Sequence, residues 1–289
     1  MSNTIELAKS FVPKLDECYR LASLTSVLDG APELAKQGAN ANELIIPMMS
    51  MDGLADYSRN GGYVQGGVTM TNETVKCNFD RGRRFDVDVM DDLETAGLAF
   101  GRLSAQFIRD KVVPELDAFR FASYCGISGV TKKEETLADG AATVAALSAA
   151  ATAMDDEEVT ATGRYLFITP TLLQGINDMD TTKSKKVLEG FERVIKVPQR
   201  RFYTAIKQLS GKTGEEAGGY TKAAGAANIN FSIIQKDALI QYTKHAAPKI
   251  IAPENNPDAD AYVFGYRMVG IAKAYKNMLS GMYFSHDQA

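Results

Sequence analysis

The first chemistry that this sequence suggests is phosphate binding, at Gly211-Lys212-Thr213. A P-loop needs another glycine five residues before its Gly-Lys pair, because the backbone N–H groups of that loop cradle the phosphates. Position 206 is Ile, so the cradle is missing and we interpret the segment as a solvated loop. The glycines of 61–67 precede predicted strands and do not open a helix, which argues against dinucleotide binding.

Histidines and carboxylates offer little further chemistry. His245 and His286 are the only histidines, and neither has Cys or acidic residues at metal-ligand spacing. No G-x-S-x-G motif marks a nucleophile. Glu115 and Asp117 lie two residues apart on a predicted helix and do not face each other, so we expect surface ion pairing, for instance with Arg120. The sequence predicts no catalytic, cofactor-binding or metal-binding residue, and hence no enzyme.

One basic cluster could act between molecules. Arg81, Arg83 and Arg84 lie within four positions of each other. They are either a solvated hairpin tip or guanidinium groups that pair with carboxylates of a neighbouring subunit, a role that suits the bidentate geometry of Arg. The candidate inter-subunit contacts are Arg81, Arg83, Arg84, Asp86, Glu115, Asp117 and Arg120.

The elements that would position this cluster are a hairpin and a long helix. Apolar residues alternate with polar ones from Val75 to Phe79 and again from Phe85 to Val89, on either side of Asp80-Arg81-Gly82-Arg83. This pattern predicts a hairpin with its turn at 80–83. An isolated two-stranded hairpin is marginally stable, so it must rest on something outside its own fold.

From Asp91 the apolar period becomes helical and continues to Ser123, with a break at 111–114 that contains Pro114. An uninterrupted helix of this length would span about 50 Å. A compact chain of this size has a radius of gyration of about 19 Å. The sequence therefore predicts an extended molecule, a building block rather than a globule around a pocket.

The remainder reads as a mixture of helices and strands without βαβ alternation, hence an α+β protein. An Ala-rich helix is expected from Asp139 to Met154, with Asp139 or Thr143 as the N-cap, ending before the acidic run 155–158. Residues 164–168 read as a buried strand, 236–245 as a short helix, and 211–225 as a mobile loop.

Composition limits the possible partners. The formal net charge of −4 and the pI near 5.4 argue against a protein that coats nucleic acid, although not against a shell that encloses it. Three cysteines without a C-x-x-C pair indicate a reducing compartment. No apolar run approaches the length of a membrane span, so we expect no membrane association.

At this point the chain resembles the tailed-phage major capsid proteins of the Hong Kong 97-like fold. The resemblance is carried by the collinear order of several segments over nearly the whole length. These are IELAKSFVPKLDE near the start, GLADYSRNGGYV at 53–64, DRGRRFDVDVMD at 80–91, VVPELDAFRF at 112–121, KVPQRRFY at 196–203, and the stretch 229–267.

The resemblance implies a division of the chain. It comprises an N-terminal arm at 1–45, an extended hairpin loop at 46–90, a peripheral domain with a spine helix at 91–137, and an axial domain at 138–289 with segments that return to the peripheral domain. The implied function is the major structural subunit of an icosahedral phage head, which assembles into hexamers and pentamers around double-stranded DNA without sequence-specific binding.

The implied partners are other copies of the chain, a separate scaffolding protein and a portal. The implied location is the virion, with assembly in the host cytoplasm. Some relatives crosslink a Lys to an Asn, but although Lys76 lies in the loop region, no motif fixes its partner and that chemistry does not carry over. Two alternatives stay open: an encapsulin-type compartment on the same fold, distinguishable by its genomic neighbours, and a small α+β enzyme or ligand-binding protein.

Overall fold

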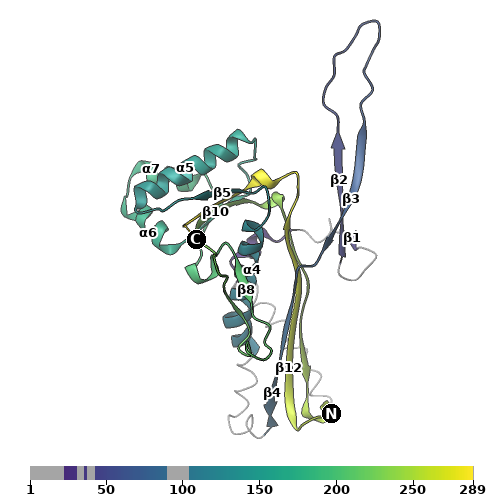
Figure 1. Cartoon of the computed structure of the whole chain (residues 1–289), viewed down its shortest axis with the longest axis vertical. Helices are drawn as coiled ribbons and strands as arrows, with labels where there is room; N and C mark the ends of the chain where they lie inside the picture. The colour runs from purple at the N-terminus through teal and green to yellow at the C-terminus, as the bar shows by residue number, and fades with distance from the viewer. Residues whose placement is uncertain (1–22, 31–35, 38–42, 90–103, 289) are drawn as a thin grey trace.

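The computed structural model describes residues 23–30, 36–37, 43–89 and 104–288. They form an α+β fold in which a helix-covered sheet lies at one side, long paired strands run beside it, and a narrow hairpin projects from one end (Figure 1). The outline is elongated, as the sequence predicted. None of the helices in these ranges is both long and apolar enough to cross a membrane.

The projecting hairpin is formed by β2 (Glu43–Met51) and β3 (Val68–Lys76), with the short β1 (Lys36–Gln37) at the edge of β2. β2 and β3 pair antiparallel from Glu43 opposite Lys76 to Met51 opposite Val68. Within the described residues β1 pairs with Leu44 and Ile45, so Pro47 lies where β2 has no described partner on that side, a position at which proline is tolerated.

The predicted hairpin with its turn at 80–83 is wrong. β4 (Phe79–Asp88) runs straight through these residues and pairs antiparallel with β12 (Ala261–Ala274), which pairs in turn with β11 (Leu239–Ile251). Gly82 allows close strand approach, since a Cβ there would lie 2.8 Å from the carbonyl oxygen of Tyr266. The alternation in 75–89 belongs to two strands of different sheets, and β4 has its partner near the end of the chain.

Helical structure covers residues 104–125, and the part of the predicted helix at 91–103 lies outside the described residues. The predicted break at 111–114 does not interrupt it. A π-helical turn, η3 (Ile108–Val112), leads directly into α4 (Val113–Cys125), with Pro114 in the first turn of α4. The wider hydrogen bonding of a π-turn accommodates the missing N–H of proline.

The second layer is a five-stranded sheet covered on both faces. Its order is β5 (Thr131–Glu134), β13 (Met282–His286), β10 (Ile229–Gln235), β6 (Arg164–Ile168) and β7 (Arg193–Lys196). Helices α5 (Gly140–Asp156), α6 (Pro170–Asp178) and α7 (Thr182–Glu189) pack on one face. On the other face, Phe121 of α4 contacts Phe167 and Phe202, with ring centroids 5.1 and 4.8 Å away. This contact joins the sheet to the helix.

Two local predictions in this layer have different outcomes. Asp139 caps α5 by accepting a 2.7 Å hydrogen bond from the Ala142 N–H, as predicted. The helix does not end before the acidic run, because Arg164 forms a 2.7 Å ion pair with Asp155 and donates to the carbonyl oxygens of Val159 and Thr160. The buried guanidinium offsets the negative charge at the C-terminus of the helix. Residues 164–168 form the buried strand that was predicted.

The remaining elements are short. β8 (Ile206–Gln208) and β9 (Tyr220–Lys222) form a small ribbon whose connecting loop is residues 209–219. The helix predicted at 236–245 is wrong: after η5 the chain enters β11. The 3₁₀ turns are η1 (Thr25–Leu28), η4 (Gln199–Arg201), η5 (Lys236–Ala238), η6 (Pro253–Asn255) and η7 (Leu279–Gly281).

Candidate functional site

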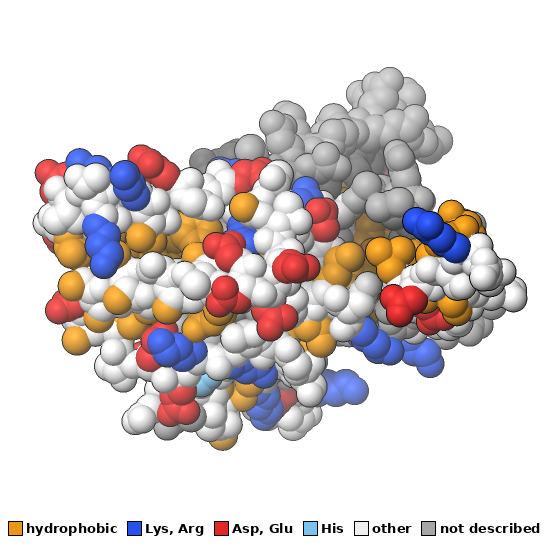
Figure 2. Space-filling model, turned by 90° about the horizontal axis from the view of Figure 1, so that it is seen from above, with side chains coloured by type: hydrophobic (Ala, Val, Ile, Leu, Met, Phe, Trp, Pro, Cys, Tyr) orange, Lys and Arg blue, Asp and Glu red, His pale blue; other side chains and the backbone are white. Residues whose placement is uncertain are grey.

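Large apolar side chains stand exposed on the projecting hairpin. Of the nine that are exposed in the described part of the chain, eight lie between residues 49 and 70. Leu54 and Tyr63 are almost fully accessible, at 108% and 91% of their reference areas. In the view from above, hydrophobic side chains are visible at the right of the molecule, the side from which the hairpin projects, as well as over its left half (Figure 2). An exposed apolar surface of this kind marks a protein-interaction site.

One face of the hairpin strands is apolar. Met49 lies opposite Met70 and Met51 opposite Val68, and side chains of directly paired residues project from the same side of a sheet. We call these four residues the hairpin face. Methionine is flexible and polarisable, so it adapts to partner surfaces of varied shape. The hairpin face is therefore suited to contact with another protein surface.

The root of the hairpin is fixed to the long sheet. Val75 is buried against Ile240 of β11 and Ile271 of β12. Asn78 then forms two hydrogen bonds with the backbone of Ala272, its Nδ2 donating to the carbonyl oxygen and its Oδ1 accepting from the N–H, both at 2.9 Å. The hairpin is thus held at the two-residue joint between β3 and β4, and its far end projects freely in Figure 1.

Arg81 is bound within its own chain. Its Nε lies 2.8 Å from Oε1 of Glu115 on α4, and its Nη2 donates to the carbonyl oxygens of Leu209 at 2.7 Å and Gly219 at 3.3 Å. Burial raises the pKa of the Glu115 carboxyl, and the charge of Arg81 opposes that shift. One guanidinium therefore links β4, α4 and the β8–β9 loop.

The other two arginines of the cluster face solvent. Arg83 donates from Nη2 to the carbonyl oxygen of Glu216 at 2.8 Å. Arg84 forms a 2.8 Å ion pair with Asp86, and both side chains are about half exposed. Hydrogen bonding to Asp86 raises the pKa of the Arg84 guanidinium further above its ordinary value. Among the predicted contacts, Arg83, Arg84 and Asp86 are the ones whose side chains are open to a neighbour.

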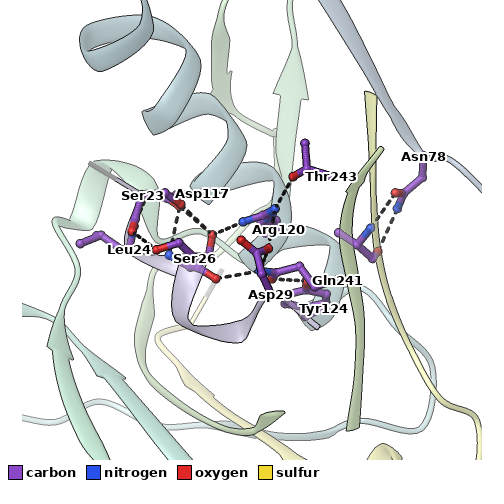
Figure 3. A network of polar contacts seen from close by, with 12 residues as sticks. Ser23, Leu24, Ser26, Asp29, Asn78, Asp117, Arg120, Tyr124, Gln241 and Thr243 are labelled. Carbon is purple, nitrogen blue, oxygen red and sulfur yellow. Dashed lines mark hydrogen bonds and ion pairs between the residues drawn. The ribbon is translucent and has the colours of Figure 1, made fainter. Parts of the chain in front are cut away.

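Asp117 lies at the centre of a buried polar network (Figure 3). Its carboxylate accepts hydrogen bonds from the hydroxyl of Ser23 (2.9 Å), the N–H of Leu24 (3.1 Å), and both the N–H and hydroxyl of Thr25 (3.3 and 2.8 Å). Arg201 is a further donor, with its Nη1 3.2 Å from Oδ2 of Asp117. These donors satisfy a fully buried carboxylate and fix residues 23–25 to α4.

Arg120, one turn further along α4, continues this network. Its Nη1 donates to the Thr25 hydroxyl at 2.8 Å and its Nη2 to Asp29 at 3.2 Å. Gln241 of β11 donates to the same Asp29 carboxylate at 2.8 Å and accepts from the Tyr124 hydroxyl at 2.6 Å. The network therefore joins the segment 23–30 to both α4 and the long sheet, close to Asn78 (Figure 3).

The positions of the seven predicted residues thus differ. The surface position expected for Asp117 and Arg120 is corrected, because they are 0% and 2% exposed and their bonds are made inside the subunit. Glu115 is nearly buried and is paired with Arg81. The interface role of the seven stays a prediction. Sequence reasoning missed the hairpin apolar residues, although Leu54, Tyr57 and Tyr63 are unusual within a Gly-, Asp- and Asn-rich loop.

A groove of about 920 Å³ lies between β4, the helical segment 106–115 and the β8–β9 loop. Aromatic side chains line it, among them Phe79, Phe85 and Phe107, together with Arg81 and Arg83. Because its walls combine aromatic rings with guanidinium groups, this groove suits a partner that carries apolar side chains and carboxylates.

The residues that the structure describes contain no cluster of three or more His, Cys, Asp or Glu able to hold a metal. Burial raises the pKa of the Cys125 thiol to about 11 and raises the pKa of Tyr124. Gly211-Lys212-Thr213 lies in the exposed β8–β9 loop, which connects two strands and opens no helix.

Comparisons by sequence find no matching family model and no matching curated protein. Comparison by structure finds many matches. The virus-like particle from Pyrococcus furiosus has a TM-score of 0.60 at 10% identity, over 97% of this chain and 99% of that chain. A structure from Gordonia phage Cozz has a TM-score of 0.60 at 10% identity, over 93% and 87%.

The capsid structure of the cyanophage P-SCSP1u matches with a TM-score of 0.54 at 12% identity, over 87% of this chain and 85% of that chain. Identities this low carry information on fold alone, but the matches extend over nearly the full length of both chains. The chain therefore has the α+β fold of phage capsid proteins, the fold that the virus-like particle shares.

Proposed function

We propose that this chain is the major structural subunit of an icosahedral phage head. Copies would assemble into hexamers and pentamers that form the shell around double-stranded DNA, so the finished protein would reside in the virion after assembly in the host cytoplasm. The observation that carries this proposal is the projecting hairpin, whose apolar residues are exposed in the isolated subunit. A subunit with this surface is incomplete without a neighbour.

The proposed mechanism is repeated contact between copies. The hairpin of one subunit lies across its neighbour and buries the hairpin face together with Leu54, Tyr57 and Tyr63. Each contact is weak, but a closed shell repeats it many times, so the sum stabilises the assembly. Arg83, Arg84 and Asp86 contribute inter-subunit ion pairs at the exposed side of β4.

The proposed division of the chain is the one that the Hong Kong 97-like resemblance implies. The arm is 1–45, the extended loop is 46–90, the peripheral domain with its spine helix is 91–137, and the axial domain is 138–289. The five-stranded sheet and α5–α7 support an axial domain. β11 and β12 support the return segments, because they pair with β4 rather than with the axial sheet.

DNA would be enclosed without sequence-specific contacts, since a net charge of −4 disfavours neutralisation of phosphates. A scaffolding protein would set the curvature of the growing shell, and a portal would occupy one vertex. These two partners follow from the resemblance alone.

Electron microscopy of the purified chain, with and without a co-expressed scaffolding protein, tests the proposal. We expect closed polyhedral shells, or rings of five and six subunits that convert to shells. A monomer or dimer under every condition, with scaffolding protein included, would contradict it.

An encapsulin-type compartment is the second candidate, favoured by the match to the virus-like particle over 99% of that chain. The two candidates differ in content. Shells isolated from the native source would contain DNA and a portal in the first case, and a packaged enzyme without a portal in the second. Mass spectrometry of the shell contents distinguishes them.

A further inference from the structure

The loop between β8 and β9, residues 209–219, is tied to β4 at two points. Arg81 binds the base of the loop, donating to the carbonyl oxygens of Leu209 and Gly219. These two residues also close the loop, through a 2.8 Å hydrogen bond from the Leu209 N–H to the Gly219 carbonyl. Arg83 binds the far part of the loop at the carbonyl oxygen of Glu216.

The two ties differ in strength. Arg81 is also paired with the nearly buried Glu115, whereas the Arg83 contact is a single exposed hydrogen bond to a neutral acceptor. Such bonds contribute little in water. Gly218 and Gly219 have φ of +63° and +80° and adjoin the base, where they provide backbone freedom. The far part of the loop can therefore open while its base stays bound.

The local fit of Arg83 depends on glycine. A Cβ on Gly218 would lie 2.7 Å from Nη1 of Arg83, and one on Gly211 would lie 3.4 Å from it. The guanidinium therefore fills the space beside these two glycines when the loop is closed. The contact is built for an arginine at position 83, which argues against a chance approach of a surface side chain.

Arg83 also differs from the other β4 arginines in its partner. Arg81 is paired with Glu115 and Arg84 with Asp86, but within the described residues Arg83 binds no carboxylate. A carboxylate binds a guanidinium more strongly than a neutral carbonyl oxygen does, because it adds the attraction of opposite charges and can accept two parallel N–H···O bonds. A carboxylate on a second molecule would therefore compete effectively with the Glu216 carbonyl oxygen.

The loop is one wall of the 920 Å³ groove. Opening of residues 210–218 would widen this groove and expose more of its aromatic lining beside Arg83. Both changes favour entry of a segment that carries apolar side chains and an acidic residue. The exposed hairpin has this character, since Leu54, Asp56 and Tyr57 lie together and are all exposed.

We propose that residues 209–219 form a latch over the groove and that Arg83 holds this latch closed in the free subunit. In the shell, a carboxylate of a neighbouring copy pairs with Arg83 in place of the Glu216 carbonyl oxygen. This exchange rests on the proposed function, because the second copy is present only in an assembly. The latch itself is a property of the single subunit and is tested separately.

The first experiment uses the free subunit and trypsin, which cleaves after the exposed Lys212 within the latch. We expect Arg83→Ala to be cleaved there several-fold faster than the wild type, as quantified by mass spectrometry. Arg84→Ala is the matched control, since it removes an exposed arginine of the same strand that does not touch the latch. An unchanged melting temperature verifies that Arg83→Ala is folded. Cleavage of Arg83→Ala at the wild-type rate overturns the latch.

The second experiment compares hydrogen exchange at the amides of residues 210–218 in free subunits and in assembled shells. Faster exchange in shells supports the transfer of Arg83 to a neighbour. Unchanged or slower exchange overturns that transfer and leaves the latch to the first experiment. Failure to form shells overturns the proposed function and the transfer together, whereas the trypsin result still decides the latch.

Discussion

The hydroxyl of Thr25 and the carboxylate of Asp117 are 2.8 Å apart in the interior of the subunit. The same hydroxyl accepts a hydrogen bond from Arg120, so it lies between an anion and a cation one turn apart on α4. This arrangement satisfies both charges through a neutral group and fixes the start of the described chain to the helix. Breaking these hydrogen bonds would strongly lower the free energy of unfolding, because a buried charge would lose its partners.

Asp117→Asn is expected to lower the free energy of unfolding by about 3 kcal/mol, because an amide cannot accept from all the donors that surround the carboxylate. Urea denaturation of the free subunit measures this loss. Asp110→Asn, an exposed acid in the same helical segment, is the control and should change stability by less than about 0.5 kcal/mol. Equal effects of the two substitutions would contradict the buried network.

Replacing Met49 and Met70 together by Ser is expected to leave the subunit folded and to reduce the yield of closed shells strongly. These two residues form half of the hairpin face and make no contribution to the core. Negative-stain microscopy and circular dichroism provide the two readouts. Ser50→Ala with Thr69→Ala, a directly opposed pair on the other face of the hairpin, is the control. Normal assembly of the Met49/Met70 variant would remove the hairpin face from the interface.

Arg81→Ala is expected to destabilise the subunit in a pH-dependent manner. Burial raises the pKa of the Glu115 carboxyl above its ordinary value, and the charge of Arg81 opposes this rise. For a carboxyl with a raised folded-state pKa, the cost of ionisation is present above that pKa and disappears below the unfolded-state pKa. Without Arg81 the folded-state pKa rises further.

The stability difference between Arg81→Ala and the wild type should therefore be largest near pH 7, at about 2 kcal/mol, and should shrink as the pH falls towards the ordinary pKa of a glutamate carboxyl. Urea denaturation at several pH values measures it. Arg84→Ala, whose partner Asp86 is about half exposed, should show no such dependence. A pH-independent loss for Arg81→Ala would mean that its bonds to the loop carbonyls dominate.

The carboxyl of Glu215 has a pKa lowered to about 2, first by the hydrogen bond from Lys207 and then by the Ser210 N–H. A lowered folded-state pKa contributes stability above the usual carboxyl pKa, and this contribution is lost as the pH falls through the lowered value. The loop should therefore keep its structure well into the acidic range.

Carbon-detected NMR titration of the glutamate carboxyls tests this. Lys207→Ala should raise the titration midpoint of Glu215 towards its usual value, because it removes the largest cause of the shift. Lys212→Ala, a lysine of the same loop, should leave the midpoint unchanged. An unshifted midpoint in Lys207→Ala would show that the backbone N–H alone stabilises the carboxylate.

Gly82→Ala is expected to destabilise the subunit by about 1–3 kcal/mol, since the added Cβ would lie 2.8 Å from the Tyr266 carbonyl oxygen and separate β4 from β12. Gly265→Ala provides a control in the same sheet, because its nearest contacts would be at 3.8 Å. Thermal denaturation of both variants measures the difference in stability. Similar melting temperatures would mean that the strands shift without cost.

Gly82 also shows why the sequence predicted only part of the fold. A glycine among charged residues is typical of a turn, and period-two alternation specifies a strand without specifying its partner. Strand structure was predicted for residues 85–89 but a turn at 80–83, because the continuation of β4 through Gly82 depends on its pairing with residues 261–270, far along the chain. Local patterns do indicate helix caps and buried strands. Asp139 could therefore be named among the candidate N-caps, and the strand 164–168 was predicted correctly.

The candidate site was predictable to a similar extent. The arginine cluster is visible in the sequence, but the choice between an internal and an external partner is not. Arg81 pairs inside the subunit because α4 places Glu115 beside β4, and Asp117 is buried because residues 23–25 cover it. The hairpin apolar residues were overlooked since their exposure depends on the hairpin standing clear of the body.

Because the hairpin is attached through the short joint at Cys77 and Asn78, a small change of its angle near that end moves its far end by a larger distance. Only these two residues separate β3 from β4, and both Asn78 and the buried Val75 hold this end of the hairpin to the long sheet, so the exposed part of the hairpin beyond Val75 can bend while that anchor holds. The strand and loop beyond it extend about 50 Å at ~3.3 Å per residue. A rotation of about 5° at the root would then move the far end by about 4 Å. One sequence could in this way meet neighbours at the different angles of five-fold and six-fold rings without repacking its core.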